Sequence, residues 1–188
     1  MDSLLLLVIV LFAPILIGVG LYNSLIDKRN RLDEALSSVD VMLKKRYDLV
    51  PNLVAAVERY MDHERDLLRV VTELRTRAMA GHLETAEGAE LDRQMEAALG
   101  RLMVAVEAYP ELKASQNFLQ LQAALNEIEE KVGAARRNYN RSVTDYNNAI
   151  ETFPRSMMAA SMRLQRKPVF EVAEAERQAP DVKALFRA

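Results

Sequence analysis

Residues 4–21 read LLLLVIVLFAPILIGVGL, an apolar run without a charged side chain, and the uncharged stretch extends from Ser3 to Leu25. A helix rises about 1.5 Å per residue, so a stretch of this length spans the hydrocarbon core of a bilayer, about 30 Å thick. Within lipid the backbone must satisfy its own hydrogen bonds, which predicts a helix that tolerates Pro14. The sequence therefore predicts a transmembrane anchor over residues 1–27, in contact with the bilayer through residues 3–25.

A cleaved signal peptide is the alternative interpretation of this stretch. Such a peptide has a positively charged start, a shorter apolar run and small residues before the cleavage site. Here the only early charge is Asp2, and Gly18-Val19-Gly20 fits a cleavage site poorly. These signals favour a permanent anchor.

Basic residues are distributed unevenly about the anchor. None precedes it, whereas Lys28, Arg29 and Arg31 follow it directly, and a second cluster stands at residues 44–46. The positive-inside rule therefore predicts an outside N-terminus and a cytoplasmic C-terminal domain. The same basic residues also suit local helix pairs with neighbours such as Asp27, and the two roles are compatible.

The chain after the anchor keeps apolar residues at intervals of three and four, which is typical of amphipathic helices. The first stripe covers residues 25–43. The anchor is expected to run into it, because no glycine or proline lies between Leu21 and Pro51. Residues 47–51 are either a helix boundary, with Asp48 as the cap and Pro51 in the first turn, or a kink.

Further stripes predict three more helices, and no segment shows the two-residue period of a strand. Short connections place neighbouring helices antiparallel. The expected fold is all-α, with a single N-terminal transmembrane helix followed by an up-and-down (antiparallel) four-helix bundle over residues 28–154. The three helices are expected at residues 53–78, 89–107 and about 110–153, separated by a loop at 81–88 and by Tyr109-Pro110.

Composition narrows the functional classes. The chain has 188 residues, 25 basic and 27 acidic side chains, two histidines and no cysteine. The lack of cysteine excludes disulfides, thiolate zinc sites and cysteine nucleophiles, and the balanced charge argues against nucleic-acid binding. Leu67 stands where a zincin motif beginning at His63 would need its second histidine. We expect no catalysis, no cofactor, no metal site and no small-molecule substrate.

Carboxylates are concentrated near the middle of the last predicted helix. Glu127, Glu129 and Glu130 lie close together there, and no histidine lies near them in the sequence. At helical spacing such a cluster is typical of a solvated face rather than of a metal site.

The segment after the bundle, residues 155–167, has four basic residues and no acid. This composition is typical of a short amphipathic segment on anionic lipid, although its methionines could equally cap the end of the bundle. Residues 167–170 are expected to be extended and the tail after Pro180 loose, which makes 155–188 an amphipathic and extended C-terminal region. The candidate membrane-surface residues are Arg155, Met157, Met158, Met162, Arg163, Leu164, Arg166 and Lys167.

Two strings carry a family resemblance, KRYDLVPNLV at residues 45–54 and YPELKASQNFLQLQ at residues 109–122. Together with Arg29-Asn30, ALSSVDVML at residues 35–43, Ala135-Arg136 and the Tyr-Asn pairs at 22–23, 139–140 and 146–147, they resemble the LemA family over almost the whole chain after the anchor. The resemblance implies a four-helix bundle behind one span in a bacterial plasma (inner) membrane, but it implies no mechanism. Some relatives occur with a membrane zinc metalloprotease of the HtpX type, and some divergent members help to build magnetosome membranes. Others carry a lipid-modified cysteine after the span, which this chain lacks.

The polar and turn residues of these motifs are candidate interaction residues. They serve either as caps and interhelix hydrogen bonds inside the bundle or as a partner surface, and the lack of reactive groups nearby favours the structural role. They are Asn23, Asn30, Asp40, Arg46, Asp48, Pro51, Asn52, Tyr109, Pro110, Asn117, Arg136, Tyr139, Asn140, Tyr146 and Asn147.

These features favour a membrane-anchored helical scaffold or adaptor that acts through protein contacts, and lipid contacts, without catalysis. Parallel anchors in one bilayer raise the effective concentration of the helices, which predicts a homo-oligomer. The alternative is an accessory subunit of a membrane protease or quality-control system, with an HtpX-type metalloprotease as the partner.

Overall fold

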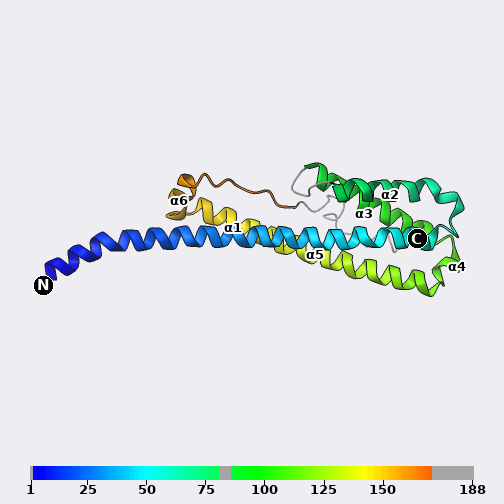
Figure 1. The fold of residues 1–188 in the computed structure, drawn as a ribbon, viewed down its shortest axis with the longest axis horizontal. Coiled ribbons are helices and arrows are strands. Elements are labelled where there is room, and N and C mark those ends of the chain that lie inside the picture. Colours follow the sequence, from blue (N-terminus) through cyan, green and yellow to red (C-terminus); the bar gives the residue numbers. More distant parts are fainter. Residues whose placement is uncertain (1, 81–85, 171–188) are drawn as a thin grey trace, which may run out of the picture. The chain divides into compact units, whose positions relative to one another are not determined.

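The computed structural model describes residues 2–80 and 86–170, and every regular element in these ranges is a helix (Figure 1). The prediction of an all-helical chain with one long apolar N-terminal helix is confirmed. The long helices are α1 (Asp2–Val57), α2 (Arg65–Ala80), α3 (Ala86–Val106) and α5 (Gln116–Glu151). The short elements are the 3-10 helix η1 (Asp62–Glu64), α4 (Pro110–Lys113) and α6 (Arg155–Ser161).

Helix α1 is continuous over 56 residues, so the apolar anchor and the amphipathic stripe lie on one helix, as expected. The helix is long and apolar enough to cross a membrane, with a mean hydropathy of 1.7 over its most apolar stretch. Side chains of this stretch remain uncovered, for example Val10 at 71% and Leu16 at 70% exposure. An exposed apolar surface of this kind is typical of a segment that contacts a membrane or another protein.

The helix passes through Pro51 and ends only at Val57, so residues 47–51 are not a helix boundary and Asp48 caps no helix start. Proline has no N–H, which deprives the carbonyl of Tyr47 of its helical donor. The guanidinium of Arg75 in α2 donates to that carbonyl instead, with Nε 2.9 Å from the oxygen. A hydrogen bond from a neighbouring helix thus replaces the one that Pro51 cannot make.

The chain reverses instead at residues 58–64, so the single helix expected over 53–78 is wrong. Its first residues belong to α1 and its later ones to α2. The N–H groups of Tyr60 and Met61 both bond to the carbonyl of Val57, at 2.9 and 3.1 Å, and the Met61 side chain is fully buried. No glycine or proline marks this turn, and the apolar spacing continues across it, so the sequence pattern does not reveal it.

The other boundaries agree more closely with the apolar stripes. Helix α3 begins within the expected loop 81–88, of which residues 81–85 lie outside the described residues. The predicted break at Tyr109-Pro110 is confirmed, with Pro110 in the first turn of α4. Helix α5 ends at Glu151, two residues before the expected stop. The tail after Pro180 lies outside the described residues.

The chain forms two compact units. The anchor unit combines α1 up to Asp33 with the chain from Asn138 onward, and the core unit comprises Glu34–Arg137. The sequence-based division into residues 1–27, 28–154 and 155–188 stays a prediction. In the core unit, buried apolar residues come from all four long helices, among them Val39, Leu43, Val71, Met95, Leu102, Phe118 and Leu125.

Helices α1 and α5 run antiparallel in the core unit. Arg46 of α1 lies against Glu129 of α5, at 3.3 Å. Asn52, which lies further along α1, lines the same surface pocket as Asn117, which lies earlier on α5. Helix α2 packs on α3 in the same unit.

The replacement of the missing Pro51 hydrogen bond can be tested by a double-mutant cycle. We expect Arg75→Met to lower the free energy of unfolding by about 1–3 kcal/mol, because it leaves the partly buried Tyr47 carbonyl without a donor. In a Pro51→Ala background, residue 51 regains its N–H, and the same substitution should cost clearly less. Thermal unfolding followed by helical circular dichroism measures both, and equal losses in the two backgrounds would contradict the explanation.

Candidate functional site

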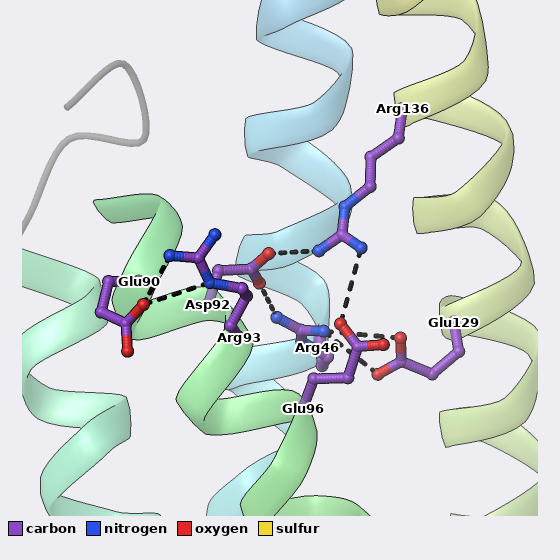
Figure 2. Close-up of polar contacts among 7 residues, drawn as sticks. All are labelled: Arg46, Glu90, Asp92, Arg93, Glu96, Glu129 and Arg136. Carbon is purple, nitrogen blue, oxygen red and sulfur yellow. Dashed lines mark hydrogen bonds and ion pairs between the residues drawn. The ribbon is translucent and has the colours of Figure 1, made fainter. Parts of the chain in front are cut away.

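An arginine occupies the apolar stripe of α1 in the core unit. Arg46 is fully buried, at helical spacing from the buried Leu43 and Val50. Its Nη2 pairs with Asp92 of α3, and its Nη1 lies 3.3 and 3.4 Å from the two carboxylate oxygens of Glu129 of α5 (Figure 2). A buried guanidinium is tolerated only when carboxylates compensate for its lost hydration.

Asp92 joins this arginine to a second one. Its side chain is buried, and Figure 2 shows it between the guanidinium groups of Arg46 and Arg136, each paired with a different carboxylate oxygen. Arg136 of α5 also lies 3.5 Å from Glu96, one turn after Asp92 on α3. These contacts run from Glu129 through Arg46, Asp92 and Arg136 to Glu96. We call these five residues the charge network.

The electrostatics of the charge network keep Arg46 ionised. Burial by itself lowers the pKa of Arg46, because it disfavours the charged form. The carboxylates of Asp92 and Glu129 act in the opposite direction and prevail, so the pKa of Arg46 is raised. Burial, with a further contribution from Asp92, also raises the pKa of the neighbouring Tyr47. The network is therefore an ionic connection among three helices, α1, α3 and α5.

Sequence reasoning singled out Arg46 and Arg136 but missed Asp92 and Glu96. A signal was present, because Asp92 falls at helical spacing with the buried Met95 and Leu99, just as Arg46 falls between Leu43 and Val50. Opposite charges at apolar-stripe positions of two helices indicate a buried pair.

The carboxylate cluster of α5 divides in the structure. Glu127 pairs with Lys131 on the surface, as a solvated face predicts. Glu129 is half-buried and bonds to Arg46, so its assignment to a solvated face is wrong. The spacing within α5 did not show this, because the partner lies 83 residues away in the sequence.

A second polar arrangement lies in the anchor unit, where the chain after α6 runs along α5. The Asn147 side chain makes two hydrogen bonds to the main chain of Lys167. Asn147 Nδ2 donates to the Lys167 carbonyl at 2.9 Å, and the Lys167 N–H donates to Asn147 Oδ1 at 3.0 Å. Asn140 makes the same pair of bonds with Phe170, at 2.9 and 2.8 Å. Each asparagine thus pairs with both main-chain groups of one residue, as a neighbouring β-strand would.

Two tyrosines complete this arrangement. The hydroxyls of Tyr146 and Tyr139 donate to the carbonyls of Gln165 and Pro168, each at 3.2 Å. The ring of Phe170 also packs on Tyr139, with centroids 4.8 Å apart. We call Tyr139, Asn140, Tyr146 and Asn147 the Tyr–Asn ladder, and residues 164–170 the strap.

The ladder and the strap have matching repeats. Ladder residues recur after seven helical positions, a rise of about 10.5 Å. Their main-chain partners recur after three residues, which in extended chain is about 10 Å. The strap runs antiparallel to α5 and is extended, as predicted for residues 167–170, and the side chains of 165–169 are exposed. The ladder therefore recognises main chain rather than a particular side-chain sequence.

The other candidate interaction residues lie outside these two arrangements. Asn52 and Asn117 line an open surface pocket of about 550 Å³ in the core unit, beside Tyr60. Tyr109 is half-buried just before α4. The exposed residues are Asn23, Asn30, Asp40, Asp48, Pro51, Asn52, Pro110 and Asn117.

The candidate membrane segment 155–167 is helical only over its first seven residues, which form α6. Residues 164–167 belong to the strap, and the expectation that residues 155–167 lie on anionic lipid stays a prediction. Arg166 pairs with Glu151 at 2.9 Å, and Lys167 is held through its main chain. Met157 is 69% exposed, Arg163 is exposed, and the half-buried residues are Arg155, Met158, Met162 and Leu164.

Among the residues that the structure describes, no group of three or more His, Cys, Asp or Glu side chains is arranged so that it could hold a metal ion. His63 is exposed on η1.

The charge network gives a stability prediction. Asp92→Asn keeps the shape of the side chain but leaves Arg46 without its buried counter-charge, so we expect a loss of about 3–5 kcal/mol in the free energy of unfolding. Glu90→Gln, in the exposed pair with Arg93, should change it far less, because water screens an exposed pair. Urea unfolding of the detergent-solubilised chain compares the two, and equal effects would argue against a buried network.

The amino-acid sequence is similar to one family model and to several known proteins. The model of the LemA family matches residues 35–184. The chain is 28% identical to Protein LemA of Metamycoplasma hominis, over 89% of this chain and 76% of that protein. It is 22% identical to Magnetosome protein MamQ 2 of Paramagnetospirillum magneticum and to Magnetosome protein MamQ of Magnetospirillum gryphiswaldense, over 80% and 79% of this chain. These alignments span 64% of each magnetosome protein, so the chain corresponds to part of their length.

Proposed function

This chain belongs to the LemA family, and on that premise we propose that it is a membrane-anchored helical scaffold that acts through protein and lipid contacts. The observation that carries the proposal is the continuity of α1. One helix of 56 residues leads from uncovered apolar side chains, such as Val10 and Leu16, to the fully buried Val39 and Arg46. Because no turn interrupts it, a bilayer that holds its first part also tethers the chain that packs on its later part.

The proposal includes an up-and-down four-helix bundle in the core unit. It is supported by the antiparallel course of α1 and α5, by the packing of α2 on α3, and by polar contacts between helices. Arg75 connects α2 to α1, and the charge network connects α1, α3 and α5. Short connections, such as residues 107–109, favour this arrangement.

The proposed orientation places the chain after the span, residues 28–188, in the cytoplasm of a bacterial cell. Lys28, Arg29 and Arg31 follow the apolar stretch directly, and no basic residue precedes it. The positive-inside rule gives such residues the decisive weight. A scaffold of this kind needs no reacting group, and self-association of parallel anchors supplies its first set of contacts.

Membrane extraction tests the proposed anchor. We expect the full chain to stay in the membrane pellet through an alkaline carbonate wash, and a variant that lacks residues 2–25 to appear in the supernatant. Amine crosslinking in intact membranes should give species larger than the monomer. Affinity purification of these species identifies what is bound, and a membrane metalloprotease among them would favour the accessory-subunit role. A full-length chain that is washed out, or that crosslinks only as a monomer, would contradict the scaffold.

Lipid contact at the end of α5 is the second part of the proposal. Asp145 lies 3.5 Å from Lys28, three residues past the predicted span. Since α5 runs antiparallel to α1, its last six residues extend about 9 Å further toward the apolar part of α1. Phe153 and Met157 follow there and are 75% and 69% exposed. Exposed apolar side chains at this level suit the interface of a bilayer.

Tryptophan fluorescence tests this contact, because the chain contains no tryptophan of its own. We expect Met157→Trp to be quenched by brominated phospholipids in proteoliposomes, since the indole would lie at the lipid interface. Val104→Trp, at a 74% exposed position of α3 in the core unit, is the matched control and should not be quenched. Equal quenching of the two indoles, or none at position 157, would remove the lipid contact from the proposal.

A further inference from the structure

The strap is held to the anchor unit mainly through its main chain. The side chains of residues 165–169 are exposed, and Phe170 is only half-buried. Helix α6, which precedes the strap, buries a single side chain, Ala159. Little apolar surface therefore opposes the release of this segment, whereas the polar pairs with the ladder hold it in place.

The turn that directs the strap onto α5 uses an unfavourable backbone conformation. The N–H groups of Arg163 and Leu164 bond to the carbonyls of Ala160 and Ala159, at 3.1 and 3.0 Å, which is the double hydrogen bond of a Schellman turn. The turn requires a left-handed residue, and Arg163 takes this role with φ at 53°. Glycine normally fills it, because a Cβ disfavours this conformation. Opening the turn would relieve the strain.

The position of the ladder relative to the anchor is fixed by contacts of α5 with α1. Asp145 lies 3.5 Å from Lys28, and Arg29 and Asp33 influence the pKa of Tyr146, which burial raises. Lys28 follows the predicted span by three residues, about 4.5 Å of helix. Copies anchored in one bilayer therefore hold their ladders at the same height, close to the lipid surface.

From these observations we infer that copies of this chain exchange straps: the Tyr–Asn ladder of one copy binds residues 164–170 of a second copy. The inference rests on the proposed membrane anchor and names the contact through which the scaffold self-associates. The second copy is the occupant that the geometry favours, because its strap offers the same main-chain groups at the same spacing. Exchange of an identical element is a route to oligomers that needs no new interface.

The balance between the two arrangements follows from their identical contacts. A strap in its own ladder and a strap in a neighbour's ladder make the same hydrogen bonds, so the ladder does not distinguish them. Whether a strap lies in its own ladder or in a neighbour's then depends on the strain of the turn at Arg163 and on the density of copies in the membrane. Exchange should become more frequent as the protein becomes denser in the bilayer, because only the arrangement between copies depends on concentration.

A crosslink between Glu151 and Arg166 reports where a strap lies, because these side chains are 2.9 Å apart and the chain has no cysteine. The double variant E151C/R166C, joined by a short bis-maleimide, gives an internal link when the strap lies in its own ladder. Two full-length copies with different tags, one E151C and the other R166C, give a covalent heterodimer when the strap is exchanged. We expect both products in proteoliposomes, with the heterodimer rising several-fold as the protein-to-lipid ratio increases tenfold.

Ladder variants separate exchange from simple proximity. With N140A/N147A in both copies, the heterodimer should fall several-fold, whereas the matched pair N52A/N117A, two exposed asparagines in the core unit, should leave it unchanged. Helical circular dichroism checks that each variant is folded. The turn gives an independent readout: R163G relieves the strain and should lower the yield of heterodimer. R163P cannot adopt the positive φ, so it should raise the yield.

Three outcomes would overturn the inference. They are an internal link without any heterodimer at every density, a heterodimer that persists in folded N140A/N147A, and a heterodimer that R163G and R163P leave unchanged. Amine crosslinks to larger species without this heterodimer would reject strap exchange and leave the scaffold intact. Loss of the chain from carbonate-washed membranes would reject the scaffold itself.

Discussion

The pairing of Arg46 with Asp92 is the interaction on which the arrangement of the core unit depends. A guanidinium in the apolar stripe of α1 is tolerated only if carboxylates from other helices reach it, so α3 and α5 must present Asp92 and Glu129 at that level. A shift of any of the three helices by one turn would leave a buried charge without its partner. The network thus fixes how α1, α3 and α5 are aligned along their lengths, because their apolar stripes alone would permit several alignments.

In both units, side chains form hydrogen bonds with main-chain groups that have no main-chain partner. In the core unit, Arg75 supplies the donor that Pro51 lacks, which allows α1 to continue. In the anchor unit, Asn140 and Asn147 supply both a donor and an acceptor to an extended segment that has no neighbouring strand. In each case a side chain takes the place of a backbone partner.

The candidate residues chosen from the family motifs fall into two groups, those that make contacts inside the protein and those that are exposed. Arg46, Arg136 and the four ladder residues make contacts inside the protein, whereas Asn52 and Asn117 are exposed beside a surface pocket. The tyrosine and asparagine pairs could be recognised from their seven-residue spacing, but their partner could not, because nothing in the sequence of the strap indicates which helix it follows. Asp92 could have been found from the sequence, because it interrupts the apolar stripe of its helix and its charge is opposite to that of Arg46.

Local physical chemistry is enough to determine much of this protein from its sequence. The apolar run, the helical period, the break before Pro110 and the end of the last long helix depend on residues near one another in the chain. Only the tertiary structure decided that α1 passes through Pro51, that the chain turns at 58–64, that Arg46 meets Asp92, and that the strap lies on α5. Each of these depends on contacts between side chains or main-chain groups that packing alone brings together, and no local pattern encodes which distant partner will be present.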